Sequence, residues 1–262
     1  MREEPLPEDV ILETRDLTKH YGGVHALEGA NFALRKGEHV AIMGDNGAGK
    51  STFVRQITGV EQPTRGEIIL GGAPVHFAGP LDARAAGIET VFQSLALADD
   101  LDVPDNLFLG RELVRLRLGP FSILDYRTMR ERALRSLEKT AVKIPNIRNT
   151  IRNMSGGQRQ CVAIARTATF HSKLTIMDEP TAALGVQETA QVENIIRTLK
   201  EAGEPLILIS HNMRQVFDLV DRIVVFRRGR VVADLKKEET DGQDVVAYIT
   251  GAKTGTVYEK AA

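Results

Sequence analysis

The sequence has one cysteine, no long apolar run and almost no net charge, and each shortage excludes a class of protein. Cys161 rules out an internal disulfide, which suits a reducing compartment. No stretch approaches the ~18 apolar residues of a membrane-spanning helix, and the acidic, proline-bearing N-terminus is unlike a signal peptide. A net charge of -1 does not favour non-specific nucleic-acid binding, although a local basic patch remains possible. We expect a soluble, cytoplasmic protein that reaches a membrane only through a partner.

A glycine-rich stretch, His39–Thr52, follows a short apolar segment and organises the chain. Val40–Met43 predicts a buried strand, and Gly44–Ser51 matches the phosphate-loop pattern G-x-x-x-x-G-K-[ST]. Its glycines permit backbone angles that a Cβ would forbid, so amide groups can converge on an anion, and the helix predicted from Lys50 to about Thr58 adds the positive end of its dipole. A glycine-rich turn with a chance lysine is disfavoured, because strand and helix are the context that the motif requires. The expected nucleotide-binding residues here are Gly44, Asp45, Asn46, Gly47, Ala48, Gly49, Lys50, Ser51 and Thr52.

The rest of the chain divides into three predicted parts. Short strands near hairpin turns predict an antiparallel sheet, at 10–17, 30–34, 66–70 and 75–77. Residues 94–152 predict a mostly helical insert, with one helix at 127–139. Helices and strands then alternate, which predicts a parallel sheet covered on both faces, followed by a β-hairpin turning at 228–229 and a last helix at 242–250. We therefore expect one α/β domain over 10–250, whose core and β lobe comprise 10–93 and 153–250, between flexible tails at 1–9 and 252–262.

Polar residues follow several of the predicted parallel strands, where ligands bind in such sheets. Asp178, at the end of an apolar strand, could hold Mg²⁺ near the Ser51 hydroxyl, and Lys50 could bind the β- and γ-phosphates. Glu179 could orient and deprotonate an attacking water, a role worth roughly 10²–10⁴-fold in rate. Two idle acids at a strand end are the alternative, which the phosphate loop disfavours.

Weaker signals surround this group. His211 could donate to the γ-phosphate or position water, or could make only a local hydrogen bond. Gln93 could touch Mg²⁺ or water, or could cap a loop, and Tyr21 could stack on a nucleotide base or pack internally. Cys161 is expected to pack inside a helix. The remaining histidines have no metal-ligand spacing and receive no role: His20, His25, His39, His76 and His171.

The segment Met154–Gln158 (MSGGQ) carries the family resemblance. Ser155 and Gln158 fit a capping box, so a capped helix is the simple interpretation. Two glycines nevertheless suit a first helical turn poorly, since each costs about 1 kcal/mol against alanine in a helix interior. A bare backbone there could press against an anion. The sequence resembles the ATP-binding cassette (ABC) ATPases, whose motif is usually LSGGQ, from about Val10 to Thr250. The motifs follow the family's order: Tyr21, GDNGAGKST, Gln93, MSGGQ, LTIMDE and His211.

The resemblance implies a RecA-like P-loop core with an antiparallel β lobe and a helical insert, working as a head-to-tail dimer that holds ATP between two copies. By this resemblance Tyr21 stacks on adenine. Lys50 and the loop amides hold the phosphates, Ser51, Gln93 and Asp178 serve Mg²⁺, Glu179 is the base and His211 contacts the γ-phosphate. The segment Ser155, Gly156, Gly157 and Gln158 would bind the γ-phosphate of the other copy's nucleotide. One departure from the family is Gly185, where many relatives carry the aspartate of S-A-L-D.

Three phrases, SLALADDLDVPDNLFLGRE, EPTAALGVQE and ISHNM, resemble ATPases of bacterial sugar importers of the ribose/xylose/fructose type. This implies an ATP- and Mg²⁺-dependent subunit at the inner face of the cell membrane. Its partners would be a second copy or a related ATPase subunit, a multispanning permease met around 93–111 and, indirectly, a periplasmic sugar-binding protein, with no nucleic acid. Two alternatives are a soluble ABC ATPase acting on nucleic acid or ribosomes and an importer of a non-sugar solute. A P-loop kinase would not explain MSGGQ.

Overall fold

The structure is a computed structural model that describes residues 9–255 apart from 119, 120, 141, 143, 171 and 183. The chain forms two compact units. Unit 1 contains the residues up to 90, residues 173–179 and the residues from 200 onward, and unit 2 contains residues 91–172 and 180–199. The tails predicted at 1–9 and 252–262 lie largely outside the described residues. Within the described part of the chain, no helix is both long and apolar enough to span a membrane.

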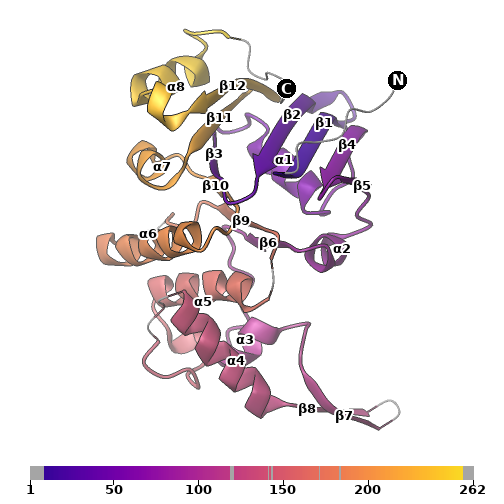
Figure 1. Cartoon of the computed structure of the whole chain (residues 1–262), viewed down its shortest axis with the longest axis vertical. Coiled ribbons are helices and arrows are strands. Elements are labelled where there is room, and N and C mark those ends of the chain that lie inside the picture. The colour runs from indigo at the N-terminus through magenta and orange to yellow at the C-terminus, as the bar shows by residue number, and fades with distance from the viewer. Residues whose placement is uncertain are drawn as a thin grey trace. The chain divides into compact units, whose positions relative to one another are not determined.

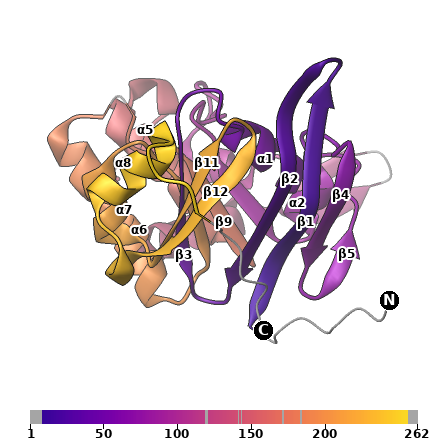
Figure 2. The same cartoon turned by 90° about the horizontal axis from the view of Figure 1, so that it is seen from above.

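Unit 1 contains a four-stranded antiparallel sheet with the strand order β2-β1-β4-β5 (Figures 1 and 2). Its first two strands are longer than predicted and pair around a tight turn at Gly22-Gly23, which places His20 opposite His25. The strand predicted at 75–77 was wrong in position, because the turn at Gly71-Gly72 returns the chain into pairing at once. The strands are β1 (Val10–Tyr21), β2 (Val24–Arg35), β4 (Arg65–Leu70) and β5 (Ala73–Val75).

A six-stranded sheet with the order β12-β11-β3-β10-β9-β6 carries the strands that end at the candidate site. Strand β10 pairs in parallel with β3 on one side and β9 on the other, and Ile209 lies opposite both Ile42 and Asp178. Consequently the carboxyl ends of these three strands meet at one edge of the sheet. The strands are β3 (His39–Met43), β6 (Ile88–Val91), β9 (Leu174–Asp178), β10 (Leu206–Ile209), β11 (Arg222–Arg227) and β12 (Arg230–Lys236).

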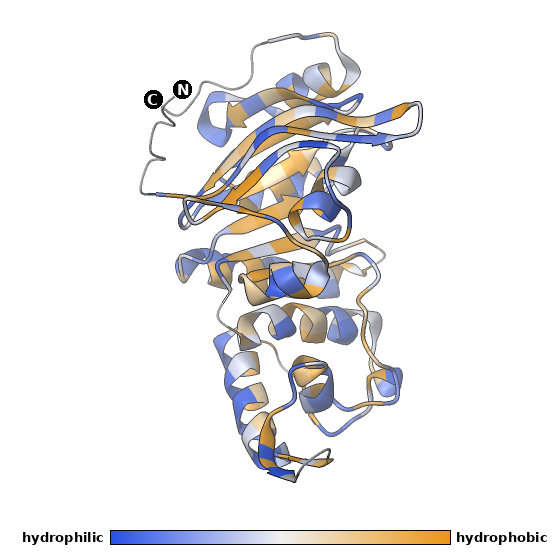
Figure 3. Ribbon diagram, turned by 90° about the vertical axis from the view of Figure 1, so that its right-hand side faces the viewer, coloured by the Kyte–Doolittle hydropathy of each residue, from blue (hydrophilic) through white to orange (hydrophobic). Residues whose placement is uncertain are grey.

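The core of unit 1 joins both sheets and helix α1. Phe53 of α1 packs between Phe32 of β2 and Phe226 of β11, with ring centroids 5.4 and 5.3 Å apart, and all three side chains are buried. Strands β3 and β10 are buried along their whole length. In the hydropathy view, orange is concentrated in the strands in the middle of the sheets, and the outer strands carry more blue (Figure 3). The short helix α2, with proline in its first turn, was not predicted. The helices of unit 1 are α1 (Lys50–Ile57), α2 (Pro80–Ala85), α7 (Met213–Leu219), η2 (Lys237–Glu239) and α8 (Gly242–Thr250).

Unit 2 contains several helices and a β-hairpin. Within residues 94–152, where a mostly helical insert was predicted, the helices are α3, α4 and the short η1. Strands β7 and β8 pair where helix was expected from the sequence, and residues 119 and 120 between them lie outside the described residues. Helices α4 and α5 pack together, and Ser136 Oγ donates to the Ala165 carbonyl at 2.9 Å. The elements are α3 (Val103–Phe108), β7 (Val114–Leu118), β8 (Phe121–Leu124), α4 (Tyr126–Lys139), η1 (Ile151–Asn153), α5 (Gly156–Thr169) and α6 (Val186–Glu201), which ends in unit 1.

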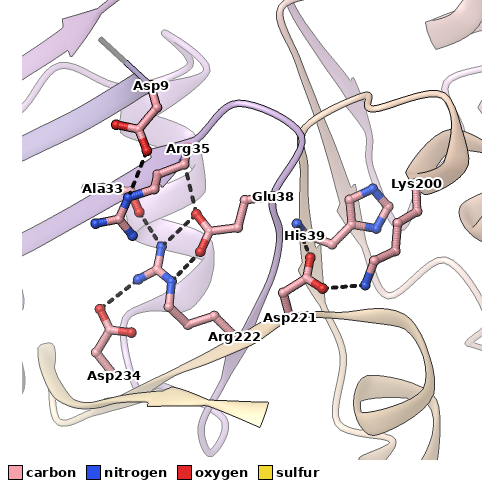
Figure 4. Close-up of polar contacts among 9 residues, drawn as sticks. All are labelled: Asp9, Ala33, Arg35, Glu38, His39, Lys200, Asp221, Arg222 and Asp234. Atoms are coloured by element: carbon pink, nitrogen blue, oxygen red, sulfur yellow. Dashed lines mark hydrogen bonds and ion pairs between the residues drawn. The ribbon is translucent and has the colours of Figure 1, made fainter. Parts of the chain in front are cut away.

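A buried arginine ties the two sheets of unit 1 together (Figure 4). Arg222 on β11 pairs with Glu38 and Asp234, each at 2.7 Å, and its guanidinium also donates to the Ala33 carbonyl on β2. Burial raises the pKa of Asp234 although the charge of Arg222 opposes this, so the carboxylate depends on its partner. The arginine therefore satisfies three acceptors that are otherwise costly to bury.

We expect Arg222→Met to lower the free energy of unfolding by about 3 kcal/mol, because it leaves Glu38 and Asp234 buried without their cation. Urea denaturation would measure the loss. Arg127→Met is the matched control: Arg127 pairs with Glu131 at the surface and its side chain is 91% exposed, so a change within about 0.5 kcal/mol is expected. Equal losses in the two variants would show that the buried network contributes nothing specific.

Candidate nucleotide site

The phosphate loop connects β3 to α1, and two of its glycines are needed by packing. Gly44 has φ 147°, and a Cβ there would lie closer than 3.0 Å to the Phe226 carbonyl oxygen. Gly49 has φ 106°, and a Cβ there would lie 2.9 Å from the Ala26 carbonyl oxygen. Gly47 has φ 76° but no atom within 4 Å of its Cβ position, so only its backbone angle favours glycine. The loop thus keeps its shape by close contact with β2 and β11.

Two further backbone hydrogen bonds connect the phosphate loop to β2 through Gly229. Gly229, in the turn between β11 and β12, donates its amide to the Ala48 carbonyl at 2.9 Å. The Gly229 carbonyl accepts the amide hydrogen of Glu28 on β2 at 2.7 Å. A continuous backbone path therefore links β2, the β11–β12 turn and the phosphate loop. The sequence analysis predicted that hairpin but not its contact with the loop.

Lys50 begins α1, and its ammonium group is turned back onto the loop. Its Nζ donates to the carbonyls of Gly44 at 2.6 Å and Asp45 at 2.9 Å. Burial lowers the pKa of Lys50, while the negative charges of Glu179 and Asp178 oppose that effect. These carboxylates therefore belong to the electrostatic surroundings of the lysine. An added phosphate would stabilise the charged ammonium further.

Asp178 and Glu179 lie at the end of β9, and their backbone is held by β10. Burial, followed by repulsion from Glu179, raises the pKa of Asp178, and the charge of Lys50 opposes this. Glu179 has φ 51°, an uncommon angle for a residue with a side chain, and its amide donates to the Ile209 carbonyl at 2.9 Å. This hydrogen bond to β10 holds the strained backbone of Glu179 in place and so fixes the direction of its side chain.

His211, which follows β10, lies in hydrogen-bond contact with Glu179: Nδ1 and Oε1 are 2.8 Å apart. The imidazole is 77% exposed, whereas the carboxylate side chain is only 17% exposed. Beneath them, Ser210 is buried, with its Oγ donating to the Gln215 side chain at 3.0 Å and accepting the Asn212 amide at 3.1 Å. The sequence analysis expected Glu179 and His211 at one edge, and the structure adds that they touch.

Tyr21 ends β1, and its ring is 42% exposed. Its hydroxyl contacts the carboxylate of Glu61, and Lys19 Nζ lies 5.3 Å from the ring centroid. No sequence pattern pointed to Glu61, because the contact spans 40 positions. Ser51 is exposed and Thr52 half-buried in the first turn of α1. Base stacking by Tyr21 and metal ligation by Ser51 remain predictions.

The remaining predicted residues belong to unit 2. Gln93 is exposed in the loop after β6. Ser155 caps helix α5: Ser155 Oγ accepts the Gln158 amide at 3.2 Å, and Gln158 Oε1 accepts the Ser155 amide at 3.0 Å. The capping box is therefore confirmed. Phosphate binding by Gln93 and by Ser155, Gly156, Gly157 and Gln158 stays a prediction.

Glu188 explains one of the two glycines of this segment and was missed by sequence reasoning. A Cβ at Gly157 would lie closer than 3.0 Å to Glu188 Cγ, whereas one at Gly156 would meet only Leu184 at 3.9 Å. Gly157 therefore admits the first turn of α6, and Gly156 leaves the start of α5 open. Glu188 Oε2 also lies 2.5 Å from the Cβ position of Gly185. A carboxylate thus stands beside the position where the resembling proteins carry aspartate, supplied from α6.

Comparison with known proteins decides the family. Residues 27–182 match the family model described as ABC transporter, more than half of the chain. The chain belongs to the ABC transporter family. The fructose import ATP-binding protein of Rhizobium meliloti is 46% identical over 251 residues, 95% of this chain and 96% of that protein. The xylose/arabinose import ATP-binding protein of Sulfolobus acidocaldarius is 42% identical over 247 residues, 94% of this chain and 96% of that protein.

A solved ABC cassette supports the same assignment through its fold. The dimeric post-hydrolysis structure of the ATP-binding cassette MJ0796, bound to ADP and Pi, superimposes with a TM-score of 0.73 at 25% identity. The match covers 87% of this chain and 99% of that chain. The predicted P-loop α/β fold is therefore confirmed, and so is the predicted family.

The histidines without a predicted role lie in different surroundings in this ABC protein. His39 is buried, and burial lowers its pKa while Nε2 lies 3.0 Å from the Glu204 carbonyl oxygen. His76 is exposed, and His171 lies outside the described residues. His20 and His25 lie together, which their separation in the sequence did not suggest.

Proposed function

We propose that this chain is the ATP-hydrolysing subunit of an importer for a sugar, acting through a separate multispanning permease. The observation that carries the proposal is the grouping of Lys50, Asp178, Glu179 and His211 at the end of three neighbouring strands of unit 1. The named import ATP-binding proteins, which match this chain over nearly their whole length, support the sugar class. A transport ATPase of this kind works at the inner face of the cell membrane.

The phosphates of ATP fit the phosphate loop, where Lys50 and the α1 N-terminus supply positive charge. Mg²⁺ fits the same place: the half-buried carboxyl of Asp178 has a raised pKa, so a nearby cation would stabilise its ionised form. Asp178, the Ser51 hydroxyl and Gln93 are the residues proposed to hold the ion. When bound, it would neutralise charge on the β- and γ-phosphates.

Glu179 is the proposed general base. Its Oε1 is held by His211 Nδ1, which leaves Oε2 to accept a proton from the water that attacks the γ-phosphate. His211 is exposed enough to contact that phosphate while it orients the carboxylate. Tyr21 would stack on the adenine, with Glu61 fixing its hydroxyl.

Two copies of the chain, or one copy and a related subunit, would complete each site. The capped start of α5 offers Ser155, Gly156, Gly157 and Gln158 to the nucleotide of the partner copy, and the open face at Gly156 admits an anion there. The dimeric form of MJ0796 supports this assembly. Closure of the dimer on ATP would then move the permease, which receives its sugar from a periplasmic binding protein.

Reconstitution of the chain with its permease and binding protein in vesicles tests the proposal. ATP hydrolysis should rise when one sugar of a panel is loaded on the binding protein, and the labelled sugar should accumulate inside. Best stimulation by a polar non-sugar solute would refute the sugar assignment. Hydrolysis stimulated by nucleic acid or ribosomes, without a membrane partner in the purified complex, would refute the transport assignment.

A further inference from the structure

Three potential metal ligands meet on the β1–β2 hairpin, outside the nucleotide-binding residues. The register of the hairpin places His20 directly opposite His25, and their rings stack with centroids 3.9 Å apart and planes at 19°. Glu28, further along β2, reaches the same point: its Oε2 lies 3.0 Å from His20 Nε2 and 2.9 Å from His25 Nδ1. Among the described residues, no other group of three His, Cys, Asp or Glu side chains has its ligand atoms this close together.

These distances suit a shared ion. A tetrahedral ion with bonds of about 2.0–2.2 Å holds neighbouring ligand atoms about 3.3 Å apart. The two nitrogens already lie within a few tenths of an ångström of that distance from the carboxylate oxygen. Because the lone pair of each nitrogen lies in the plane of its ring, the two stacked rings must turn toward a common point and move outward to admit the ion.

The charge and exposure of the cluster also favour a cation. Glu28 brings a carboxylate, so the cluster offers a negatively charged oxygen beside two imidazole nitrogens. The exposed fractions of the side chains are 30% for His20, 61% for His25 and 23% for Glu28, so an ion could enter from solvent.

We propose that His20, His25 and Glu28 form a binding site for a divalent transition-metal ion such as Zn²⁺, with a fourth position open to water. Two imidazoles and one carboxylate suit Zn²⁺, Co²⁺, Ni²⁺ or Cu²⁺, whereas Mg²⁺ prefers oxygen ligands alone. The Mg²⁺ that accompanies a nucleotide would therefore not compete for this site.

The site is connected to the phosphate loop through the backbone. The Glu28 amide donates to the Gly229 carbonyl, and the Gly229 amide donates to the Ala48 carbonyl, at 2.7 and 2.9 Å. Tyr21 lies between the two histidines in the chain. A bound ion would fix the end of this hairpin and change nucleotide affinity; that consequence rests on the proposed function, whereas metal binding itself does not.

Metal titration of the full chain without an affinity tag tests the site directly. Calorimetry with Zn²⁺ should give one ion per chain, and Co²⁺ should develop the visible absorption bands of a four-coordinate complex. His20→Asn and His25→Asn should each weaken binding at least about 100-fold, since loss of a group that only orients a metal ligand costs about 10–100-fold. Excess Mg²⁺ should leave Zn²⁺ binding unchanged.

His76→Asn is the matched control, because it removes an exposed histidine outside the cluster and should leave the affinity unaltered. Circular dichroism of each variant establishes that the chain is folded. Two results with the wild-type chain would overturn the proposal: binding of less than one Zn²⁺ per chain, or displacement of the bound Zn²⁺ by Mg²⁺. Zn²⁺ binding as tight as wild type by the double variant, His20→Asn together with His25→Asn, would also overturn it. Since no readout uses ATP, failure here leaves the proposed function untouched.

Discussion

Glu179→Gln is expected to bind ATP normally but to hydrolyse it about 10²–10⁴-fold more slowly, because an amide cannot accept the proton of the attacking water. The amide keeps the shape of the carboxylate, and its oxygen can still meet His211 Nδ1, now 2.8 Å from Glu179 Oε1. The strained backbone at φ 51° is unchanged by the replacement. Steady-state phosphate release would measure the rate, and fluorescent-nucleotide titration the affinity.

The same variant should accumulate as an ATP-bound dimer in gel filtration, because hydrolysis no longer reopens it. Glu201→Gln, which neutralises an exposed carboxylate near the end of α6, is the control and should hydrolyse ATP like the wild type. A Glu179→Gln protein with near wild-type turnover would remove Glu179 as the base. Efficient turnover by a strictly monomeric wild-type form would remove the two-copy site.

Gly44→Ala should abolish measurable nucleotide binding, whereas Gly47→Ala should weaken it only modestly. A Cβ at position 44 meets the Phe226 carbonyl closer than 3.0 Å, so the loop must leave β11. Backbone strain and overpacking each cost about 1–3 kcal/mol, and both apply at this position. At position 47 only the cost of backbone strain applies, because nothing lies within 4 Å of the added methyl group.

Isothermal titration with ATP would measure the affinities of both glycine variants, and thermal unfolding would show whether the remainder of the domain is intact. Equal affinities for Gly44→Ala and Gly47→Ala would contradict the packing argument, because the two positions differ in the contact with β11. If both variants lose nucleotide affinity to a similar extent, the positive φ angle and not the contact with β11 determines the conformation of the loop.

Much of the site was predictable because its signals are local. The phosphate loop requires a strand, three glycines, a lysine and a helix in immediate succession, and the structure places β3 and α1 there. The capping box of Ser155 and Gln158 spans four residues, and both of its hydrogen bonds are formed. Parallel strands that end in polar residues predicted Asp178 and His211 at one edge, because such strands share their direction.

The errors fall where neighbours in space decide the conformation. Strand β7 has arginines alternating with leucines, a pattern of only five residues that did not outweigh the helical expectation for the insert. Residues 153–172 and 180–199 group with residues 91–152 in unit 2, while the predicted division into core, β lobe and insert stays a prediction. Segments near a unit boundary follow the contacts that they make, which no local pattern records.

The amino-acid sequence alone was sufficient to predict the family, the phosphate loop and the position of Asp178 and Glu179 at the end of β9, since each depends on residues adjacent in the chain. Only the tertiary structure decided which side chains meet: Glu179 with His211, Gly157 with Glu188, Arg222 with Glu38, and His20 with His25 and Glu28. The physical reason is that register, strand order and close packing bring these groups together. A change of one residue in the pairing of β1 and β2 would separate the two histidines.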